Sequence, residues 1–227
     1  MTKRENKMTL STEIHKRLVS QGVSFLANDN IADHVSAQEL RLLQDEVADN
    51  VETLMRSLLI DTRNDHNTQG TAQRVAKMYF QEVFKGRYEP LPKITKFPNA
   101  KQLDEMICVG PIDVKSACSH HLVPIVGSAY IGVIPSKNGN IIGLSKFNRV
   151  VEHFSRRPQI QEELCVQIAD FIEQQTEPLG TIVTIKAKHM CMSWRGVEQE
   201  SWTTTTVARG VFRTDGSTKQ EFLKSVV

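Results

Sequence analysis

The chain has 227 residues, 40% of them hydrophobic and 24% charged, and a formal net charge of +2 at pH 7. A chain of this length and composition can bury a full hydrophobic core, which excludes fibrous and intrinsically disordered proteins. Basic and acidic residues are interleaved and do not gather in runs, so no nucleic-acid partner is expected. No apolar stretch reaches the roughly 18 residues that predict a membrane span.

Residues 1–6 include Lys3, Arg4 and Glu5 and are followed by polar residues, without the apolar region of a secretion signal. We therefore expect a cytoplasmic protein. In a reducing compartment, cysteines are better suited to metal ligation or thiolate chemistry than to disulfides. The chain has four, Cys108, Cys118, Cys165 and Cys191.

The N-terminal part of the chain predicts helices. Residues 9–27 have a weak helical pattern, which we interpret as a peripheral arm ending in a loop at residues 28–30. Ser36 with Glu39 three residues later is a capping-box signature. Apolar residues then recur at steps of three and four, which predicts an amphipathic helix of about five to six turns. They are Leu40, Leu43, Val47, Val51, Leu54 and Leu58.

After a polar loop, a second helix is predicted over residues 72–83, ending at Gly86. The periodicity then changes from helical to near two. Segments rich in β-branched residues predict strands over residues 105–116, 123–134, 181–194 and 202–212. Two helices are predicted between the second and third strands, one starting near Ser145 and one at Pro158. This order predicts an α+β fold, with two helices on one face of an antiparallel sheet.

A thiol and an imidazole lie three positions apart at Cys118 and His121, so both can bind one tetrahedral metal ion. His189 and Cys191 form a second pair, at the end of a predicted strand. Because strand side chains repeat every second residue, these two are expected to project from the same face, about 6.5 to 7 Å apart. If Cys118, His121 and Cys191 bind the metal, a fourth position is left for water, as in catalytic sites.

His120 and His189 would flank this metal, and histidine suits proton transfer near neutrality. The alternative interpretation is that a buried, inert cysteine lies beside a histidine by chance, because buried cysteines are common. The second pair of cysteine and histidine disfavours this alternative, since chance would have to produce both pairs. Cys108 and Cys165 have no histidine neighbour and are interpreted as core residues. The remaining histidines, His15, His34, His66 and His153, are interpreted as surface or structural residues.

Two further patterns have a functional and an ordinary interpretation. Ser145, Lys146 and Arg149 lie at a predicted helix start, where free N–H groups attract a phosphate. The alternative is an ordinary capped helix with solvated basic residues. Glu162, next to Gln161, can accept two hydrogen bonds from the edge of a guanine. On local evidence, an acidic first helical turn explains it better.

Five separated segments together resemble the GTP cyclohydrolase I family, in the same order and at similar intervals. They are residues 118–124, 143–146, 157–162, 189–192 and 195–197, and residues 74–79 also resemble a helix of that family. The resemblance extends from about Ser36 to the C-terminus. One departure is Ser119, where the family most often has an acidic residue.

The resemblance implies a tunnelling fold, an antiparallel four-stranded sheet with two helices on one face, preceded by N-terminal helices. Residues 1–60 would form the N-terminal arm and helical region, and residues 61–227 the catalytic tunnelling-fold domain. It also implies a homodecamer of two pentamers, with active sites between subunits.

The implied activity is that of a zinc-dependent hydrolase that converts GTP and water to 7,8-dihydroneopterin triphosphate and formate, the first step of tetrahydrofolate and pterin biosynthesis. By resemblance, Cys118, His121 and Cys191 bind Zn²⁺. His120, His189 and Ser145 are the implied catalytic residues. The implied substrate-binding residues are Gln161 and Glu162 for guanine, and Lys146, Arg149, Arg195, Ser145, Arg74 and Lys77 for the triphosphate.

Two alternatives remain open from the sequence. One is another tunnelling-fold enzyme that acts on a purine or a pterin. The other is a non-catalytic oligomer that zinc stabilises, with a closed metal shell.

Overall fold

The structure of the chain is a computed structural model that describes residues 9–226. The segment 1–6, from which we inferred the absence of a secretion signal, lies outside the described residues. The chain divides into two compact units, Met1–Pro90 and Leu91–Val227. Each unit has its own cluster of buried apolar side chains.

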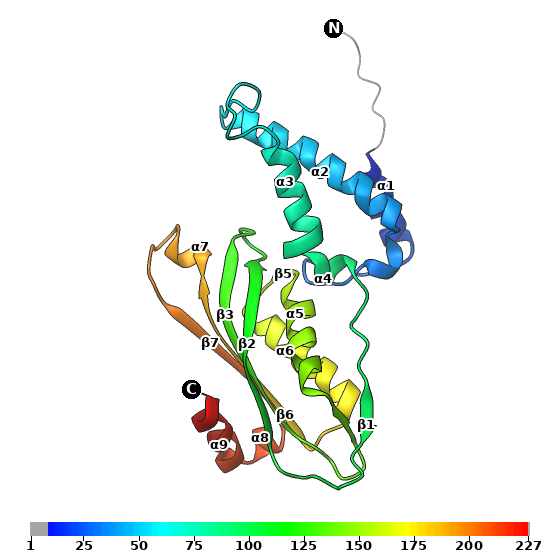
Figure 1. Cartoon of the computed structure of the whole chain (residues 1–227), viewed down its shortest axis with the longest axis vertical. Coiled ribbons are helices and arrows are strands. Elements are labelled where there is room, and N and C mark those ends of the chain that lie inside the picture. Colours follow the sequence, from blue (N-terminus) through cyan, green and yellow to red (C-terminus); the bar gives the residue numbers. More distant parts are fainter. Residues whose placement is uncertain (1–8, 227) are drawn as a thin grey trace. The chain divides into compact units, whose positions relative to one another are not determined.

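The N-terminal unit is built from helices (Figure 1). They are α1 (Leu10–Ser20), the 3₁₀ turn η1 (Ala32–His34), α2 (Ala37–Ser57), α3 (Thr71–Met78), the π-helix η2 (Tyr79–Val83) and α4 (Lys85–Tyr88). The two predicted helices correspond to α2 and to α3 with η2. Within this unit, α3 packs against α2.

Ser36 and Glu39 form the capping box that their spacing predicts. The Ser36 hydroxyl accepts a hydrogen bond from the Glu39 backbone N–H at 3.2 Å, and the Glu39 carboxylate accepts one from the Ser36 N–H at 2.8 Å. Arg17 of α1 donates to the same carboxylate at 2.6 Å. The hydrogen bond from Arg17, followed by that from Ser36, lowers the pKa of Glu39 to about 2. Glu39 therefore caps α2 and also ties α1 to it.

The Arg87 guanidinium organises the loop that follows α1. It donates hydrogen bonds of 2.5 to 3.1 Å to the backbone carbonyls of Phe25, Leu26, Ala27 and Asp29. Apolar side chains from α1 and from the segment before α2 are buried beside it, namely Ile14, Leu18, Ile31 and Val35. The arm that we interpreted as peripheral is thus packed within its unit.

The second unit contains two sheets. A two-stranded ribbon pairs β1 (Lys96–Pro98) with β4 (Asn140–Ile142). The larger sheet has the order β5-β2-β3-β6-β7, formed by β5 (Pro158–Gln159), β2 (Ile107–Cys118), β3 (Pro124–Ile134), β6 (Gly180–His189) and β7 (Trp202–Gly210). The four long strands are antiparallel, and the short β5 runs parallel to β2. The α+β class predicted from the sequence is confirmed.

Two helices, α5 (Leu144–Ser155) and α6 (Gln161–Thr176), pack on one face of the large sheet (Figure 1). Alternate strand residues such as Val114, Ile185 and Ala187 point into this layer and are fully buried. Cys165 of α6 is also buried there, and burial raises its pKa to about 12. Cys165 is therefore a core residue, as expected, whereas Cys108 is exposed and not part of the core.

Two predicted boundaries are wrong, both next to the candidate site. The helix predicted from Pro158 begins at Gln161, because Pro158 and Gln159 pair as β5 with the end of β2. The strand predicted over 181–194 ends at His189, because the short helix α7 (Met190–Ser193) follows. In each case a few residues at the end of an element follow their tertiary partners.

Two short helices close the described chain, α8 (Val211–Thr214) and α9 (Gly216–Val226). Phe212 and Phe222 are fully buried, with ring centroids 6.0 Å apart. Phe222 lies directly over Gly132 of β3, where a Cβ atom would approach its ring to 2.7 Å. The absence of a side chain at residue 132 therefore makes room for α9.

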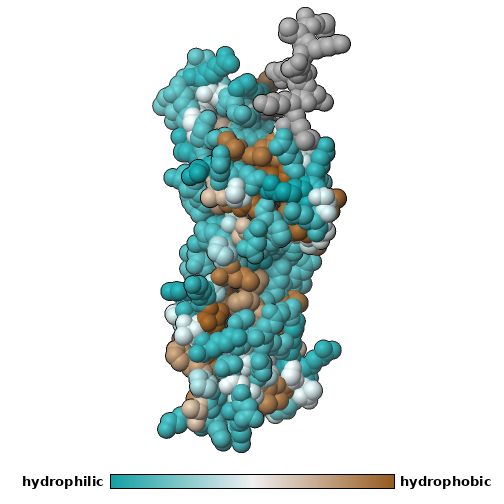
Figure 2. Space-filling view, turned by 90° about the vertical axis from the view of Figure 1, so that its right-hand side faces the viewer, coloured by the Kyte–Doolittle hydropathy of each residue, from teal (hydrophilic) through white to brown (hydrophobic). Residues whose placement is uncertain are grey.

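The face in Figure 2 is largely hydrophilic, with separate smaller apolar areas. Among residues 9–226, none of the helices has the length and apolar character that a membrane crossing requires.

Candidate metal centre and substrate site

The turn between β2 and β3 brings His121 back to Cys118. The Leu122 N–H donates to the Cys118 carbonyl at 2.8 Å, and the Cys118 N–H donates to the Val123 carbonyl at 2.8 Å. Leu122 has a φ of 55°, the left-handed conformation that such a tight turn needs. The thiol and the imidazole are thereby held close together at the end of β2.

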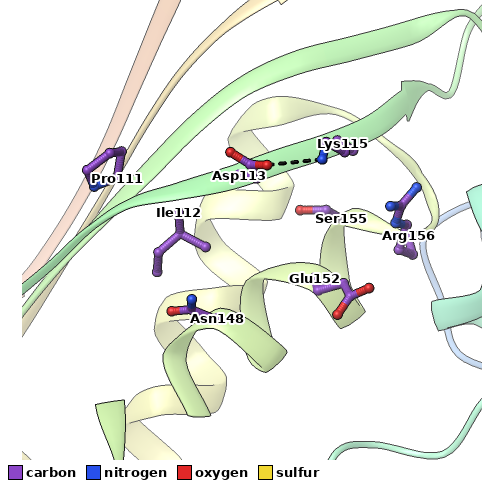
Figure 3. Close-up of a pocket in the computed structure, with 8 residues that line it drawn as sticks. All are labelled: Pro111, Ile112, Asp113, Lys115, Asn148, Glu152, Ser155 and Arg156. Atoms are coloured by element: carbon purple, nitrogen blue, oxygen red, sulfur yellow. Dashed lines mark ion pairs between the residues drawn. The ribbon is translucent and has the colours of Figure 1, made fainter. Parts of the chain in front are cut away.

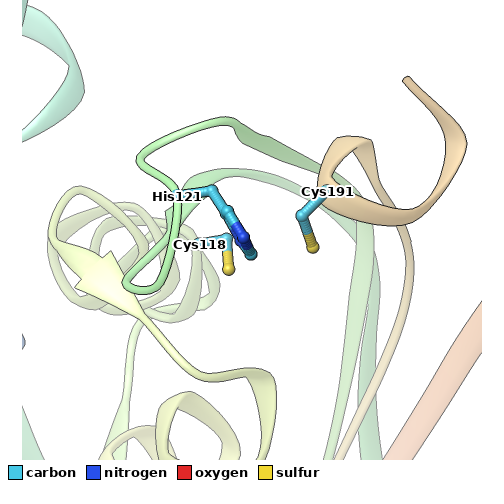
Figure 4. A group of neighbouring side chains, drawn as sticks. All are labelled: Cys118, His121 and Cys191. Carbon is cyan, nitrogen blue, oxygen red and sulfur yellow. The ribbon is translucent and has the colours of Figure 1, made fainter. Parts of the chain in front are cut away.

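Cys191 reaches the same place from α7. Since it lies on this helix and not on β6, the expected projection of His189 and Cys191 from one strand face is wrong. The grouping of the three ligands is nevertheless present: the ligand atoms of Cys118, His121 and Cys191 all lie within 4.8 Å of one another. Figure 4 shows Cys118 and His121 on one turn and Cys191 opposite them. These three residues can hold a metal ion.

The donor set fits a tetrahedral ion. Zinc–sulfur and zinc–nitrogen bonds of about 2.3 and 2.0 Å would place neighbouring ligand atoms about 3.5 to 4 Å apart, which is compatible with three ligand atoms within 4.8 Å of one another. Burial raises the pKa of the Cys191 thiol, and the adjacent Cys118 raises it further. A cation bound between the two sulfur atoms would offset this effect on Cys191, because a metal ion stabilises thiolates.

His120 contacts this group, and His189 ends β6, directly before the helix that carries Cys191. His120 Nδ1 is 3.7 Å from the Cys118 sulfur. His189 is partly buried, and its Nε2 lies 2.8 Å from the Gln161 side-chain oxygen. Burial lowers the pKa of His189, while the nearby Glu162 carboxylate opposes that change.

Among the predicted substrate residues, Arg195, Gln161 and Glu162 are near the metal group. Arg195 Nη1 is 3.4 Å from His121 Nε2. Gln161 and Glu162 begin α6, directly after β5, which pairs with Cys118 through Gln159. The Gln161 side chain is 1% exposed, whereas Glu162 is exposed to solvent.

Ser145, Lys146 and Arg149 are not brought to the metal group within one chain. They lie on the first two turns of α5, and the last turn of α5 leads to β5 and so to Cys118. At about 1.5 Å per residue, Ser145 and Lys146 lie about 14 to 15 Å, and Arg149 about 9 Å, along α5 from Ser155, the end that leads to Cys118 (Figure 1). Arg74 and Lys77 lie on α3, in the other unit.

A polar groove of about 340 Å³ between β2 and α5 was not anticipated from the sequence. Figure 3 shows Asp113 and Lys115, an ion pair at 3.0 Å, on β2 at the rim of this groove, with α5 below the strand. The remaining lining residues are Pro111, Ile112, Asn148, Glu152, Ser155 and Arg156. The sequence signal was the polar alternation at residues 113 and 115, which marks a strand side open to solvent.

The fold and the site define an α+β protein with a candidate metal centre of two cysteines and one histidine, and a further histidine, His120, contacts it. Comparison with known proteins gives the family. The family model for GTP cyclohydrolase I matches residues 47–227. The chain belongs to the GTP cyclohydrolase I family.

Several curated proteins called GTP cyclohydrolase 1 are similar over most of their length. The one from Mycolicibacterium vanbaalenii is 42% identical, covering 78% of this chain and 89% of its own. That from Aeromonas hydrophila is 40% identical, covering 85% and 87%, and that from Erwinia tasmaniensis is 38% identical, covering 96% and 98%. Among solved structures, the apo form of an archaeosine synthase QueF-Like aligns at 15% identity and a TM-score of 0.35, a likeness too weak to define the fold.

Proposed function

We propose that this protein is a zinc-dependent hydrolase that converts GTP and water to 7,8-dihydroneopterin triphosphate and formate. The observation that carries the proposal is the convergence of Cys118, His121 and Cys191, whose ligand atoms lie within 4.8 Å of one another, in a chain of this family. The reaction is the first step of tetrahydrofolate and pterin biosynthesis, which suits the cytoplasmic location expected from the sequence.

Cys118, His121 and Cys191 would hold Zn²⁺, because two thiolates and one imidazole leave a fourth tetrahedral position accessible. Zinc bound there acts as a Lewis acid that lowers the pKa of a water molecule. The alternative of a closed structural site needs a fourth protein ligand, and the group found among the described residues has three.

His189 and His120 are the proposed proton carriers. His189 donates a proton to nitrogen 7 of guanine as water adds to carbon 8, and the imidazole ring of the base opens. A second hydrolysis releases formate. His120 and Ser145 then move protons on the ribose, which rearranges to a ketose and condenses with the freed amine to close the pterin ring.

Glu162 holds the guanine edge, because an exposed carboxylate beside His189 can accept two hydrogen bonds from the base. Gln161 was predicted to share this role, but its side chain is buried and lies against His189, so it would act on the base only through His189. Lys146, Arg149 and Arg195 bind the triphosphate, with Ser145 and with Arg74 and Lys77 of α3.

The separation of these groups along α5 supports an active site shared between copies of the chain. The metal group lies near the end of α5, and Ser145, Lys146 and Arg149 lie in its first two turns. A second copy would supply the phosphate-binding residues to the metal group of the first. This arrangement agrees with a tunnelling fold assembled into a homodecamer of two pentamers.

The edges of the large sheet support the same assembly. The outer edge of β2 pairs with β5 only at Ala117 and Cys118, and the outer edge of β7 has no strand partner among residues 9–226. Open edges on both sides allow one sheet to continue into the next copy, which closes a ring and satisfies the free backbone groups. The polar groove beside β2 would then border the next subunit.

The test is to incubate the purified protein with zinc and GTP and to measure formate and, after oxidation, a fluorescent pterin. Both products are expected in equal amounts. A zinc-loaded protein that forms neither product would contradict the proposed function. It would favour a zinc-stabilised binding protein.

A further inference from the structure

The side chain of Gln161 is built into the sheet. Its amide nitrogen Nε2 lies 3.1 Å from the Ile185 carbonyl, 3.1 Å from the Thr203 carbonyl and 3.0 Å from Thr205 Oγ1. Two of these partners are backbone carbonyls, which only accept hydrogen bonds. The end of the amide that faces them must therefore be the NH₂ group, and the network fixes the orientation of the side chain.

The amide oxygen of Gln161 consequently points the other way, toward His189. The distance from this oxygen to His189 Nε2 is 2.8 Å. Since an amide oxygen only accepts hydrogen bonds, His189 Nε2 must carry a hydrogen. In the neutral ring, the lone pair is then on Nδ1.

We propose that Gln161 is a positioning residue, which holds the proton of His189 on Nε2 and so makes Nδ1 the nitrogen that exchanges protons with the substrate. The inference rests on the proposed GTP chemistry. In the proton transfer, the imidazolium gives the Nδ1 proton to the base and keeps the Nε2 proton, so the neutral ring that remains is the tautomer that Gln161 stabilises. Burial of the Gln161 side chain means that it acts through His189, while the exposed Glu162 beside it contacts the guanine.

The tautomer can be measured without turnover. We would label the zinc-loaded full-length protein with ¹⁵N-histidine, record solid-state NMR spectra at a pH where the ring is neutral, and assign His189 by its loss in His189→Gln. The wild-type protein is expected to show a protonated Nε2 and an unprotonated Nδ1. Gln161→Leu is expected to show a mixture of both tautomers. A wild-type His189 protonated on Nδ1 would overturn the proposal, even if Gln161→Leu does not fold.

Kinetics give the second readout. In Gln161→Leu, the zinc content is expected to stay at the wild-type level and kcat to fall by at least about tenfold, with little change in KM, because proton transfer is impaired and guanine binding is not. A direct guanine contact would instead raise KM. The matched control is Thr205→Val, which removes one anchor of the Gln161 amide nitrogen and leaves the oxygen facing His189; its kcat should stay within about twofold.

Failure of this inference can be distinguished from failure of the proposed function. A wild-type protein that releases no formate but has the Nε2-protonated His189 contradicts the GTP chemistry alone. A protein that turns over GTP normally, and whose Gln161→Leu variant keeps the wild-type kcat and tautomer, contradicts the positioning role alone.

Discussion

The metal content of the protein is expected to depend on Cys118, His121 and Cys191, and it can be measured separately from activity. Replacing Cys118 or Cys191 with alanine removes one of three ligands, so the purified variant should lose most of its bound zinc and its GTP turnover together. Elemental analysis of the protein measures the metal. Cys108→Ala is the control, because this cysteine is exposed and lies outside the group; it should keep the full zinc content.

Glu162 makes the complementary prediction. Glu162→Gln removes a charged acceptor for the guanine edge, which we expect to weaken GTP binding by about 2 kcal/mol, or roughly 30-fold, at unchanged zinc content. Titration calorimetry with a GTP analogue whose imidazole ring cannot be opened measures this. Glu163→Gln changes a neighbour that is also exposed and should bind like the wild type. Equal affinities of all three proteins would refute the guanine role of Glu162.

For single residues, the sequence predicted which side chains could take part in the site better than it predicted where they lie. The grouping of the three candidate ligands could be predicted because cysteine and histidine at these spacings are uncommon and suit zinc. The position of Cys191 on α7 could not, because nothing local distinguishes the end of a strand from a helical turn. The inward direction of Gln161 was also missed, since it depends on Ile185 and Thr203, which are distant in sequence.

At the scale of elements, the stability that the contact between α1 and α2 gives to the fold should depend on pH. Glu39 has its pKa lowered to about 2, first by Arg17 and then by Ser36. A depressed pKa in the folded state stabilises the fold above the ordinary value of the carboxyl group, and this stabilisation is lost as the pH falls toward 2. We therefore expect the free energy of unfolding of the full chain to fall between about pH 5 and pH 2, partly through Glu39.

The test is to unfold the wild-type and Glu39→Gln proteins with denaturant at several pH values and to monitor unfolding by circular dichroism. Glu39→Gln should be less stable than the wild type at neutral pH, and the difference should shrink in acid. Arg17→Gln should behave in the same direction. A difference between wild type and Glu39→Gln that stays constant from pH 7 to pH 2 would contradict the role of the Glu39 charge.

Elements with local signals were predicted well. The capping box fixes the start of α2, and the alternation of apolar residues gives the four long strands to within a few residues. Short strands that form only because they pair with another strand were not predicted. The short strands β1, β4 and β5 have only two or three residues each, so their pairing partners decide them, and sequence periodicity carries no information about those partners.

At the scale of the whole molecule, the separation of the two groups along α5 predicts complementation between inactive variants. A protein with Lys146→Ala and Arg149→Ala should be inactive, as should one with Glu162→Ala. If a second copy supplies the phosphate-binding residues, mixed oligomers contain some sites with neither change. Unfolding and refolding the two variants together in equal amounts should then recover about a quarter of the wild-type activity per site. In random assembly, one site in four combines the intact Glu162 of one copy with the intact Lys146 and Arg149 of another.

Each variant refolded alone is the control and should stay inactive. Light scattering should give a mass near ten times 25.6 kDa for wild type and mixtures. A fully active protein of monomer mass would contradict the shared site, as would a mixture without recovered activity.

The contact between Gly132 and Phe222 couples the centre of β3 to the C-terminal helix. A Cβ at residue 132 would lie 2.7 Å from both Ile182 Cγ2 and the Phe222 ring, and neither neighbour is exposed. Any larger residue at 132 must therefore displace the aromatic ring, at a cost of about 1 to 3 kcal/mol, unless residue 222 becomes smaller. During evolutionary divergence the two positions are expected to covary. Glycine should be retained at residue 132 as long as residue 222 of α9 is aromatic.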